Sequence, residues 1–586
     1  MKGKLAWLPL VLIALLVHNS VLAQDKPPLF VDEDTAAIVS ELNTSIPALM
    51  EKGRVPGLQI ALIRDGKIVW EKELGIKNTV SREPVTSETI FEAASLTKPF
   101  FAYAVMRLVE EGVLDLDTPL VQYLPRELIE EEMGHSLDLE GFRRDWFEKI
   151  TARHVLSHTG GMPHGERGTP YPLSFEPGTN YKYSADGYYF LQKAIEFLKK
   201  QKLEFIMDAY VLEPLGMTKS SMVWQDSYEN TMANGHDAYG TPQDFRKRTE
   251  AHAGASLYTT AADYGRFVCA MLNGEGLAEN TVKEMLARVI DVDKDMGIGW
   301  SLGFGLQTDT NGTAFWQWGD YGIFRNYILA YPEHKIAVVY LANSFYGLGI
   351  CQELVAHSIG GRALGAESLK YLQYDSPICT FAWAVIDQGP QAVDELLPTM
   401  YAKHPDLLSD RAIGMISYFF TEGERFDELI AFYSFVVEKK PESATAASGL
   451  ARAYLEKGDF ANAKANYEKA KEAENKEDFD PNTVDWALSY IEALEQLMSP
   501  SSDYLKTLAG DYETRHIKFE DGKLFYIRED AAAKDYRELI PMSKDTFVMR
   551  ELIYFRLRFD FDDTGAPHRV TGIYEWGQED HSTRDK

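Results

Sequence analysis

The segment that most constrains the fold runs from Phe91 to Lys98, where small residues lead into Ser95-Leu-Thr-Lys98. The apolar side chains that follow keep the i, i+3/i+4 spacing of one helix face: Phe100, Phe101, Ala104, Val105, Leu108 and Val109. The pattern predicts a buried helix with Ser95 at its N-terminus and Lys98 one turn later on the same side. Unpaired N–H groups there would stabilise negative charge beside a nucleophilic serine, and the amine would activate its hydroxyl. The alternative is an N-cap serine followed by a surface lysine.

The chain is long and acidic. Its 586 residues exceed what one core can organise, and two to four domains are expected. The formal net charge of −29 disfavours nucleic acid or an anionic membrane as a partner, because phosphate binding requires clustered cations. A small-molecule substrate is compatible with this charge.

The first 23 residues have the features of a secretory signal peptide. Lys2 and Lys4 precede an apolar core, Leu5 to Val17, that is too short to span a bilayer. Small residues up to Ala23 predict cleavage before Gln24, and no cysteine follows that would carry a lipid anchor. The mature chain is therefore expected to be exported, periplasmic or secreted, without a membrane span. An uncleaved anchor is the alternative.

Residues 30–365 are predicted to form an α+β domain. A helix is expected over 35–52, and two strand-like runs, 58–63 and 67–71, flank the hairpin signal Asp65-Gly66. Strand composition returns late in the domain, in four runs: 299–305, 314–320, 326–331 and 335–341. Strands at both ends with helices between them predict that the two ends share one antiparallel sheet.

Patterns that resemble metal sites are interpreted as structural. His154 and His158 have i, i+4 spacing, but no glutamate follows the first histidine and no third ligand is apparent. Every second residue from 291 to 295 is an aspartate, as in a calcium-binding loop, but the glycine and glutamate that such a loop requires are missing. No cofactor or metal is expected. The cysteines are few and far apart, which indicates no disulfide framework: Cys269, Cys351 and Cys379.

The composition becomes helical over 370–500 and strand-like over 503–580. Phe419-Phe-Thr-Glu-Gly423 and Tyr454-Leu-Glu-Lys-Gly458 lie 35 residues apart, and each precedes a second helix. This period predicts tetratricopeptide-like repeats, whose groove would bind a protein or peptide partner; an ordinary helical bundle is the alternative. The turn signals Asp521-Gly522 and Asp563-Thr-Gly565 predict a small β domain at the end.

In their order along the chain, the motifs resemble the serine β-lactamase and penicillin-binding-protein superfamily, especially its class C β-lactamase-related branch. Ser95-Leu-Thr-Lys98 matches the nucleophile motif. Tyr183-Ser184-Ala185 lies at the Tyr-x-Asn position, and Gln317-Trp318-Gly319 lies at the Lys/His-x-Gly position. The resemblance covers about residues 30–365. The strand-rich tail resembles the small β domain often appended to such hydrolases.

The resemblance implies acyl transfer. Ser95 would form an acyl-enzyme, and Lys98 and Tyr183 would share the proton, with Tyr183 favoured as the base and then as the acid for the leaving group. By the same resemblance, the N–H groups of Ser95 and Asp320 would form the oxyanion hole. Three further residues would border the substrate: Ala185, Gln317 and Gly319.

Two residues depart from the family pattern. Ala185 replaces the Asn that would contact a substrate amide, and Gln317 replaces a cation that would hold a substrate carboxylate. Arg325 is a candidate source of that missing charge. We therefore expect an exported serine hydrolase for an ester or small amide, of esterase or D-amino-acid-peptidase type, rather than for a β-lactam. The alternative is a catalytically weak, penicillin-binding-like recognition protein of the cell envelope, whose repeats bind a partner.

Overall fold

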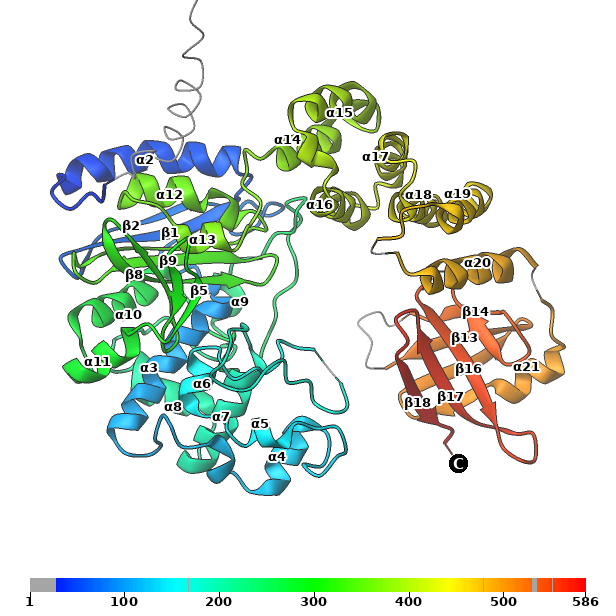
Figure 1. The fold of residues 1–586 in the computed structure, drawn as a ribbon, viewed down its shortest axis with the longest axis horizontal. Helices are drawn as coiled ribbons and strands as arrows, with labels where there is room; N and C mark the ends of the chain where they lie inside the picture. Colours follow the sequence, from blue (N-terminus) through cyan, green and yellow to red (C-terminus); the bar gives the residue numbers. More distant parts are fainter. Residues whose placement is uncertain are drawn as a thin grey trace, which may run out of the picture. The chain divides into compact units, whose positions relative to one another are not determined.

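The computed structural model describes residues 28–166, 168–477, 479–496, 498–529, 535–550 and 552–585. The chain divides into two compact units, Met1–Cys379 and Thr380–Lys586 (Figure 1). The expected signal peptide, residues 1–23, lies outside the described residues. Across the described ranges, no helix combines the length and apolar character that crossing a bilayer requires.

In the described part of the first unit, an eight-stranded antiparallel sheet has the order β2-β1-β10-β9-β8-β7-β6-β5. Two strands come from the start of the unit and six from its end: β1 (Gly57–Arg64), β2 (Lys67–Gly75), β5 (Ile290–Asp293), β6 (Ile298–Trp300), β7 (Gly305–Asp309), β8 (Gly312–Asp320), β9 (Arg325–Tyr331) and β10 (Ile336–Ala342). The α+β fold class and the sharing of one sheet by both ends of the domain are confirmed.

The hairpin between β1 and β2 forms at the predicted turn. Arg64 pairs with Lys67, and the two residues between them, Asp65 and Gly66, have φ of 52° and 69°. Two positive φ values define the turn type that Asp-Gly favours in tight hairpins. β1 is buried along its whole length, whereas β2 is an edge strand with mostly half-buried and exposed side chains.

Helices cover both faces of this sheet (Figure 1). On one face, α2 (Thr35–Lys52) packs against α12 (Cys351–Ser358), and α13 (Leu364–Ser368) contacts β6, β7 and β8. On the other face, α10 (Ala261–Asn273) packs against β1, β2 and β10. The described part of the unit has these further α-helices: α3 (Thr97–Glu110), α4 (Arg126–Met133), α5 (Arg144–Phe147), α6 (Ala152–Leu156), α7 (Asp186–Lys199), α8 (Leu203–Met207), α9 (Tyr228–Thr231) and α11 (Glu279–Leu286).

Helix α3 is buried almost all round. Every residue from Thr97 to Met106 is buried. The ring of Phe100 lies 5.4 Å from that of Phe267 in α10, and the ring of Phe101 lies 5.9 Å from that of Tyr188 in α7. The expected place of Ser95 at the start of a buried helix is confirmed, and burial extends beyond the one face that the apolar spacing marks. Other helices pack around α3, and they bury the sides that the sequence pattern left polar or small.

The second unit begins with helices. The boundary between the units falls within α14 (Pro377–Gln388), and six helices of the described chain follow: α15 (Gln391–Lys403), α16 (Asp410–Glu422), α17 (Phe426–Lys439), α18 (Ala444–Glu456), α19 (Phe460–Glu472) and α20 (Pro481–Gln496). Helix α18 starts 34 residues after α16, and α19 starts 34 residues after α17. The assignment of these helices to the tetratricopeptide class, and a partner for them, stay predictions.

A short helix, α21 (Ser502–Leu508), precedes the strands of the second unit. These form an antiparallel sheet in chain order, described as β11 (Gly510–Tyr512), β12 (Arg515–Glu520), β13 (Lys523–Arg528), β14 (Arg537–Pro541), β15 (Thr546–Val548), β16 (Phe555–Phe561), β17 (Pro567–Tyr574) and β18 (Glu579–Thr583). Asp521 and Gly522, both with positive φ, connect β12 to β13 as their turn signal predicted.

Candidate active site

Ser95 and Lys98 lie side by side at the start of α3. Ser95 belongs to a short 3₁₀ turn, Ala94–Leu96, between β3 (Phe91–Glu92) and the helix. Nζ of Lys98 lies 3.1 Å from Oγ of Ser95 and donates a hydrogen bond to the carbonyl of Gly254 at 2.9 Å. Ala94 has a φ of 50°, which is uncommon for a residue with a Cβ, and it turns the chain sharply before the serine.

Lys98 is 1% exposed, and within the described residues no carboxylate lies at ion-pair distance from it. Its surroundings are aromatic, with the ring centroids of Tyr183 and Tyr188 at 4.8 and 5.5 Å from Nζ. Burial disfavours the ammonium form and lowers the pKa of Lys98 to about 7. A large fraction of the amine is therefore neutral at physiological pH and able to accept the proton of Ser95.

Gln317 links Ser95 to Tyr183. Its Nε2 donates to the backbone carbonyl of Ser95 at 3.1 Å and to Oη of Tyr183 at 3.2 Å. Because a carbonyl oxygen only accepts hydrogen bonds, the first contact determines the orientation of the amide. The Oε1 atom of Gln317 is buried and has no hydrogen-bond partner among the described residues.

Burial raises the pKa of Tyr183, although hydrogen bonds with Ser95 and Gln317 act in the opposite direction. The phenol therefore stays protonated when the Lys98 amine is already neutral. These directions favour Lys98 over Tyr183 as the base for Ser95. The resemblance had favoured Tyr183, because the motif does not show how deeply both side chains are buried.

The two histidines of the 154–158 pair make structural contacts. Nδ1 of His154 lies 3.2 Å from the hydroxyl of Thr151, the residue that caps α6. The ring of His158 lies 4.3 Å from that of Tyr183, and its Nδ1 accepts a hydrogen bond from the N–H of Ser184 at 3.1 Å. Burial lowers the pKa of His158 well below its ordinary value, so this ring is neutral and supports Tyr183.

Strand β8 passes close to the segment before Ser95. A Cβ atom on Gly319 would lie 2.1 Å from the carbonyl oxygen of Ala93, so only glycine permits this approach. Asn326, which pairs with Gly319 from β9, donates to the carbonyl of Glu92 at 2.9 Å. These contacts hold the end of β8 against the turn that carries Ser95.

The carboxylate of Asp320 is held by three donors. Oη of Tyr371 lies at 2.5 Å, the N–H of Gly322 at 2.6 Å and Nε of Arg325 at 3.1 Å. Arg325 also donates to the carbonyl of Phe345 and stacks on its ring. The candidate source of the missing charge is thus engaged with Asp320 and Phe345, and it is not among the residues that line the cavity at Ser95.

Ala185 lies directly before α7, and its N–H donates to Nδ1 of His164 at 3.0 Å. The ring of His164 lies 5.4 Å from that of Tyr183. A histidine therefore stands beside the position where the family pattern has Asn. The sequence analysis missed it, because His164 comes from a loop and belongs to no spacing pattern.

A cavity of about 620 Å³ opens beside Ser95. Ser95, His164 and Asp320 reach it, and the ring of Trp318 lies 4.7 Å from that of Tyr183. Its aromatic wall, which the sequence analysis did not find, comes from separate segments: Tyr181, Tyr183, Trp300, Trp316, Trp318 and Tyr371. We call it the aromatic cavity. It favours a substrate group with an apolar or aromatic surface.

Several known proteins are similar in sequence. Esterase EstB of Burkholderia gladioli is 25% identical over 326 residues, which cover 46% of this chain and 80% of EstB. The unguisins hydrolase ungD of Aspergillus violaceofuscus is 23% identical over 42% of this chain and 47% of its own length. Protein flp of Staphylococcus aureus is 23% identical over 52% of this chain and 62% of its own. The match therefore spans about half to three fifths of the last two proteins.

Solved structures with a similar chain fold include an octameric penicillin-binding protein homologue from Pyrococcus abyssi. It has a TM-score of 0.45 and 19% identity, and the match covers 92% of this chain and 99% of that chain. A class C beta-lactamase has a TM-score of 0.46 and 20% identity, with 56% and 96% covered. The profile of the Beta-lactamase family matches residues 42–352, which is more than half of the chain. The chain therefore belongs to the Beta-lactamase family and is a serine hydrolase.

Proposed function

We propose that this protein hydrolyses esters or small amides through an acyl-enzyme on Ser95. The observation that carries the proposal is the buried amine of Lys98, which lies 3.1 Å from Oγ of Ser95 and whose pKa is lowered to about 7. An amine that is neutral near pH 7 is suited to take a proton from a serine hydroxyl. Similarity to an esterase supports the choice of ester substrates.

In the acylation step, Oγ of Ser95 bonds to the carbonyl carbon of the substrate while its proton moves to Nζ of Lys98. Negative charge develops on the carbonyl oxygen. We assign the N–H groups of Ser95 and Asp320 as the donors that stabilise this charge. The N–H of Tyr321 donates to the carbonyl of Phe324 across the hairpin. Because such bonds alternate along an antiparallel pair, the N–H of Asp320 points away from β9, which supports this assignment.

The bond to the leaving group then breaks. The departing oxygen or nitrogen takes the proton of the Tyr183 hydroxyl, and the Lys98 ammonium restores that proton. In the second step, water bonds to the acyl carbon and gives its proton to Lys98. Oγ of Ser95 departs from the acid product and regains a proton from Lys98, which returns the site to its starting state.

The neutral site supports ester or simple amide substrates over β-lactams. Gln317 supplies two N–H donors but no charge, and it uses both on Tyr183 and Ser95. Tyr183, the proposed proton donor to the leaving group, lines the aromatic cavity. The leaving group therefore lies in this cavity, whose rings suit an apolar or aromatic alcohol.

A hydrolysis panel of 4-nitrophenyl esters, D-amino-acid amides and β-lactams tests the proposal, with Ser95→Ala as the inactive variant and Ser174→Ala as the matched control. We expect Ser95→Ala to lower ester kcat/KM on the order of 10⁴-fold, because the nucleophile is lost. A fluorophosphonate probe should label Ser95. Efficient β-lactam turnover without ester turnover would contradict the substrate preference, and neither labelling nor turnover would favour a recognition protein.

We further propose that the protein is exported to the periplasm or the medium. The apolar core and small-residue cleavage pattern of residues 1–23 support this location. The N-terminus of the protein recovered from expressing cells should begin at Gln24. A recovered chain that starts at Met1 and remains in the cytoplasm would contradict the proposal.

A further inference from the structure

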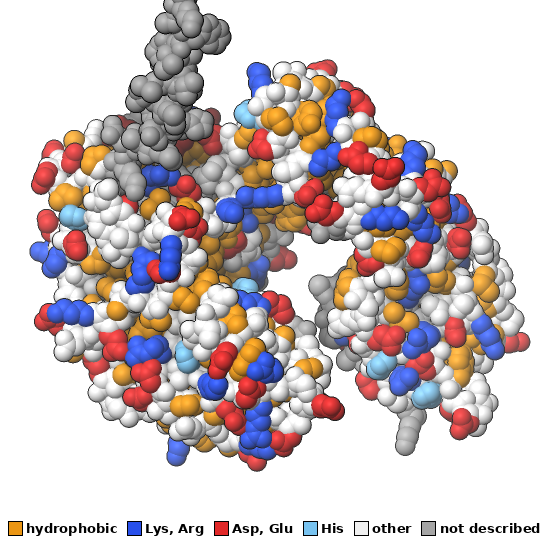
Figure 2. All heavy atoms as spheres, viewed as in Figure 1, with side chains coloured by type: hydrophobic (Ala, Val, Ile, Leu, Met, Phe, Trp, Pro, Cys, Tyr) orange, Lys and Arg blue, Asp and Glu red, His pale blue; other side chains and the backbone are white. Residues whose placement is uncertain are grey.

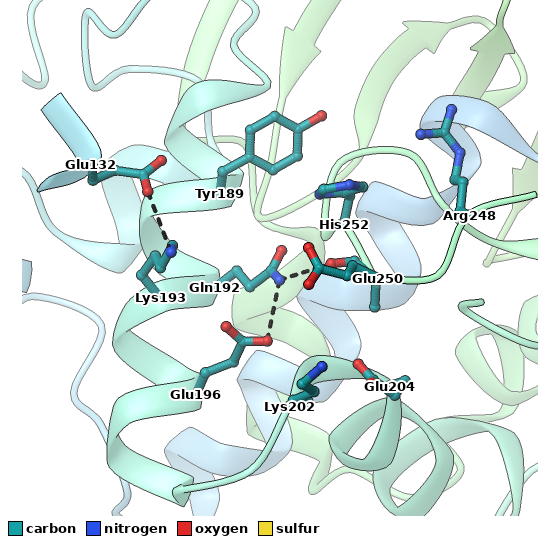
Figure 3. Close-up of a pocket in the computed structure, with 11 residues that line it drawn as sticks. Glu132, Tyr189, Gln192, Lys193, Glu196, Lys202, Glu204, Arg248, Glu250 and His252 are labelled. Atoms are coloured by element: carbon teal, nitrogen blue, oxygen red, sulfur yellow. Dashed lines mark hydrogen bonds and ion pairs between the residues drawn. The ribbon is translucent and has the colours of Figure 1, made fainter. Parts of the chain in front are cut away.

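A second cavity, of about 490 Å³, shares no lining residue with the aromatic cavity. Figure 3 shows that helix α7 and the chain around residue 250 provide most of its wall. Its lining is mostly polar and charged: Glu132, Tyr189, Gln192, Lys193, Glu196, Lys202, Glu204, Arg248, Glu250, Ala251 and His252. We call it the charged cavity, and the proposed reaction assigns no role to it.

The chain from His252 to Gly254 connects the charged cavity to the reacting groups. The carbonyl of Gly254 accepts the hydrogen bond from Lys98. A Cβ atom on Gly254 would lie 3.4 Å from Nζ of Lys98 and 3.4 Å from Oη of Tyr189. The hydroxyl of Tyr189, which lines the charged cavity, and the amine of Lys98 therefore both lie beside Gly254.

Arg248 and Arg246 both lie over the ring of Tyr321, with guanidinium carbons 4.9 and 4.6 Å from its centroid. Tyr321 directly follows Asp320 and donates to the carbonyl of Ala255. Arg246 has a carboxylate neighbour, Glu92, at 3.9 Å. The guanidinium of Arg248 has no ion pair and no hydrogen bond within the part of the chain that the structure describes, although it lines the charged cavity.

The two ends of the charged cavity differ in charge. In Figure 3, the guanidinium of Arg248 and the hydroxyl of Tyr189 point to one end, with the ring of His252 between them. The rings of Tyr189 and His252 lie 5.6 Å apart. Glu196, Lys202 and Glu204 lie at the other end in the same view, and the carboxylate of Glu250 lies between the two ends, below His252.

The remaining acidic side chains of the cavity have their own surroundings. Glu196 accepts hydrogen bonds from Gln192 and from the N–H of Leu203. Glu132 lies 3.7 Å from Lys193. Glu250 is exposed to solvent. The end of the cavity next to Lys98 therefore presents a cation, a hydroxyl and an imidazole, which is a set that suits an anion.

We propose that Arg248 binds a carboxylate at the far end of the substrate's acyl chain. The inference rests on the proposed hydrolase function. Because the leaving group lies in the aromatic cavity, the acyl chain extends the other way, past Lys98 towards Tyr189 and Arg248. The substrate class is thus an ester or amide of a dicarboxylic acid. The cation that would bind the substrate carboxylate is Arg248. The position that is a cation in the family pattern is the neutral Gln317 in this chain.

Two esters with the same leaving group and the same chain length test this inference: the 4-nitrophenyl monoester of glutaric acid, which bears a carboxylate, and 4-nitrophenyl pentanoate, which is neutral. The wild-type protein should prefer the glutarate monoester. Arg248→Gln should lower its kcat/KM about tenfold or more, mainly through KM, while changing that of the pentanoate less than about threefold. Arg248→Lys should restore part of the preference.

Lys247→Gln is the matched control, because Lys247 is the neighbouring cation but pairs with Glu229 at 2.6 Å. It should leave the preference unchanged. Raising the salt concentration from about 0.05 to about 0.5 M should weaken the wild-type preference, since ions screen the attraction. Equal losses on both esters in Arg248→Gln, or a wild-type preference for the pentanoate, would overturn the inference. Absence of Ser95-dependent turnover on either ester would instead overturn the proposed function.

Discussion

The aromatic cavity and the charged cavity differ in origin and chemistry. Ser95 lines the first, whereas the second approaches Lys98 only through the chain from His252 to Gly254. The rings of the first come from the segment before α7, from β6 and β8, and from the residues after α13, which lie far apart along the chain. The charged groups of the second come mainly from α7 and the chain around residue 250. Side-chain colours in Figure 2 show Lys and Arg interspersed with Asp and Glu over the visible surface. The aromatic cavity is therefore an apolar subsite lined by rings, whereas the charged cavity is a polar subsite lined by acidic and basic side chains.

The difference also explains how one lysine stays reactive beside so many charges. Aromatic rings and the carbonyl of Gly254 surround Nζ of Lys98, and burial is the cause that lowers its pKa. A carboxylate at contact distance would favour the ammonium form and raise that pKa again. The charged cavity can therefore contribute to selectivity without silencing the base, because none of its described carboxylates pairs with Lys98.

Lys98→Met is expected to have the largest effect, and it tests whether the proton-transfer role of Lys98 is separate from substrate binding in the two cavities. Loss of the amine should lower kcat/KM about 10³-fold for all esters alike, because general-base catalysis contributes about 10²- to 10⁴-fold. Steady-state kinetics on a neutral and a carboxylate-bearing ester measure it. A loss confined to one ester would mean that Lys98 binds substrate rather than moving the proton.

The pH dependence sharpens the same prediction. The active form is the neutral amine, so wild-type kcat/KM for a neutral ester should rise with pH through about 7, the pKa to which burial lowers Lys98. Below that pH the amine is protonated and cannot accept the proton of Ser95. Lys98→Arg, which keeps the charge and cannot deprotonate, should remain inactive across the range. A flat wild-type profile between pH 5 and 9 would contradict Lys98 as the base.

A medium effect is expected from Trp318→Leu, which removes part of the aromatic wall. The ring of Trp318 packs 4.7 Å from that of Tyr183 and 5.8 Å from that of Trp316. KM for a naphthyl ester should rise about tenfold, because aromatic pairs contribute about 0.5–1.5 kcal/mol beyond area burial. KM for the ethyl ester of the same acid should change less than about threefold. Equal changes for both esters would place the leaving group outside the aromatic cavity.

The smallest effect is expected from Tyr371→Phe, which removes one of the three donors to the Asp320 carboxylate. Kinetics should show kcat about three- to fivefold lower with KM unchanged, because Arg325 and the N–H of Gly322 still hold the end of β8. Tyr374→Phe is the matched control, since its hydroxyl bonds to Glu353 instead. A rise in KM alone would indicate that Tyr371 contacts substrate and does not position Asp320.

Much of the fold could be predicted because its signals are local. The Asp65-Gly66 turn, the apolar run after Lys98 and the strands expected over 314–320, 326–331 and 335–341 follow from short-range geometry, and the structure has them at those places. The run 299–305 instead contains the end of β6 and the turn that leads into β7. Burial of α3 extends beyond the one face that its apolar spacing marks. Periodicity registers only which side chains are apolar, whereas burial also depends on how many elements pack around a helix.

The parts of the site that could not be predicted depend on contacts between distant segments. Trp300 and Tyr371 line one cavity only because β6 lies two strands from β8 in the sheet and the chain after α13 returns to the end of β8, where Tyr371 bonds to Asp320. The spacing of His164 in the sequence does not relate it to Ala185. The fold brings Nδ1 of His164 to 3.0 Å from the backbone nitrogen of Ala185. Arg248 similarly belongs to no motif.

The sequence by itself determined the chemical identity of the reacting groups: Ser95 and Lys98 one helical turn apart, and the neutral Gln317 where the family pattern has a cation. One turn of helix is enough to bring a hydroxyl and an amine into contact, so this part needs no long-range information. Only the tertiary structure decided that Lys98 is buried away from any described carboxylate, with its pKa lowered to about 7. Desolvation is the sum of contacts from segments distant in the chain, and no single motif contains it.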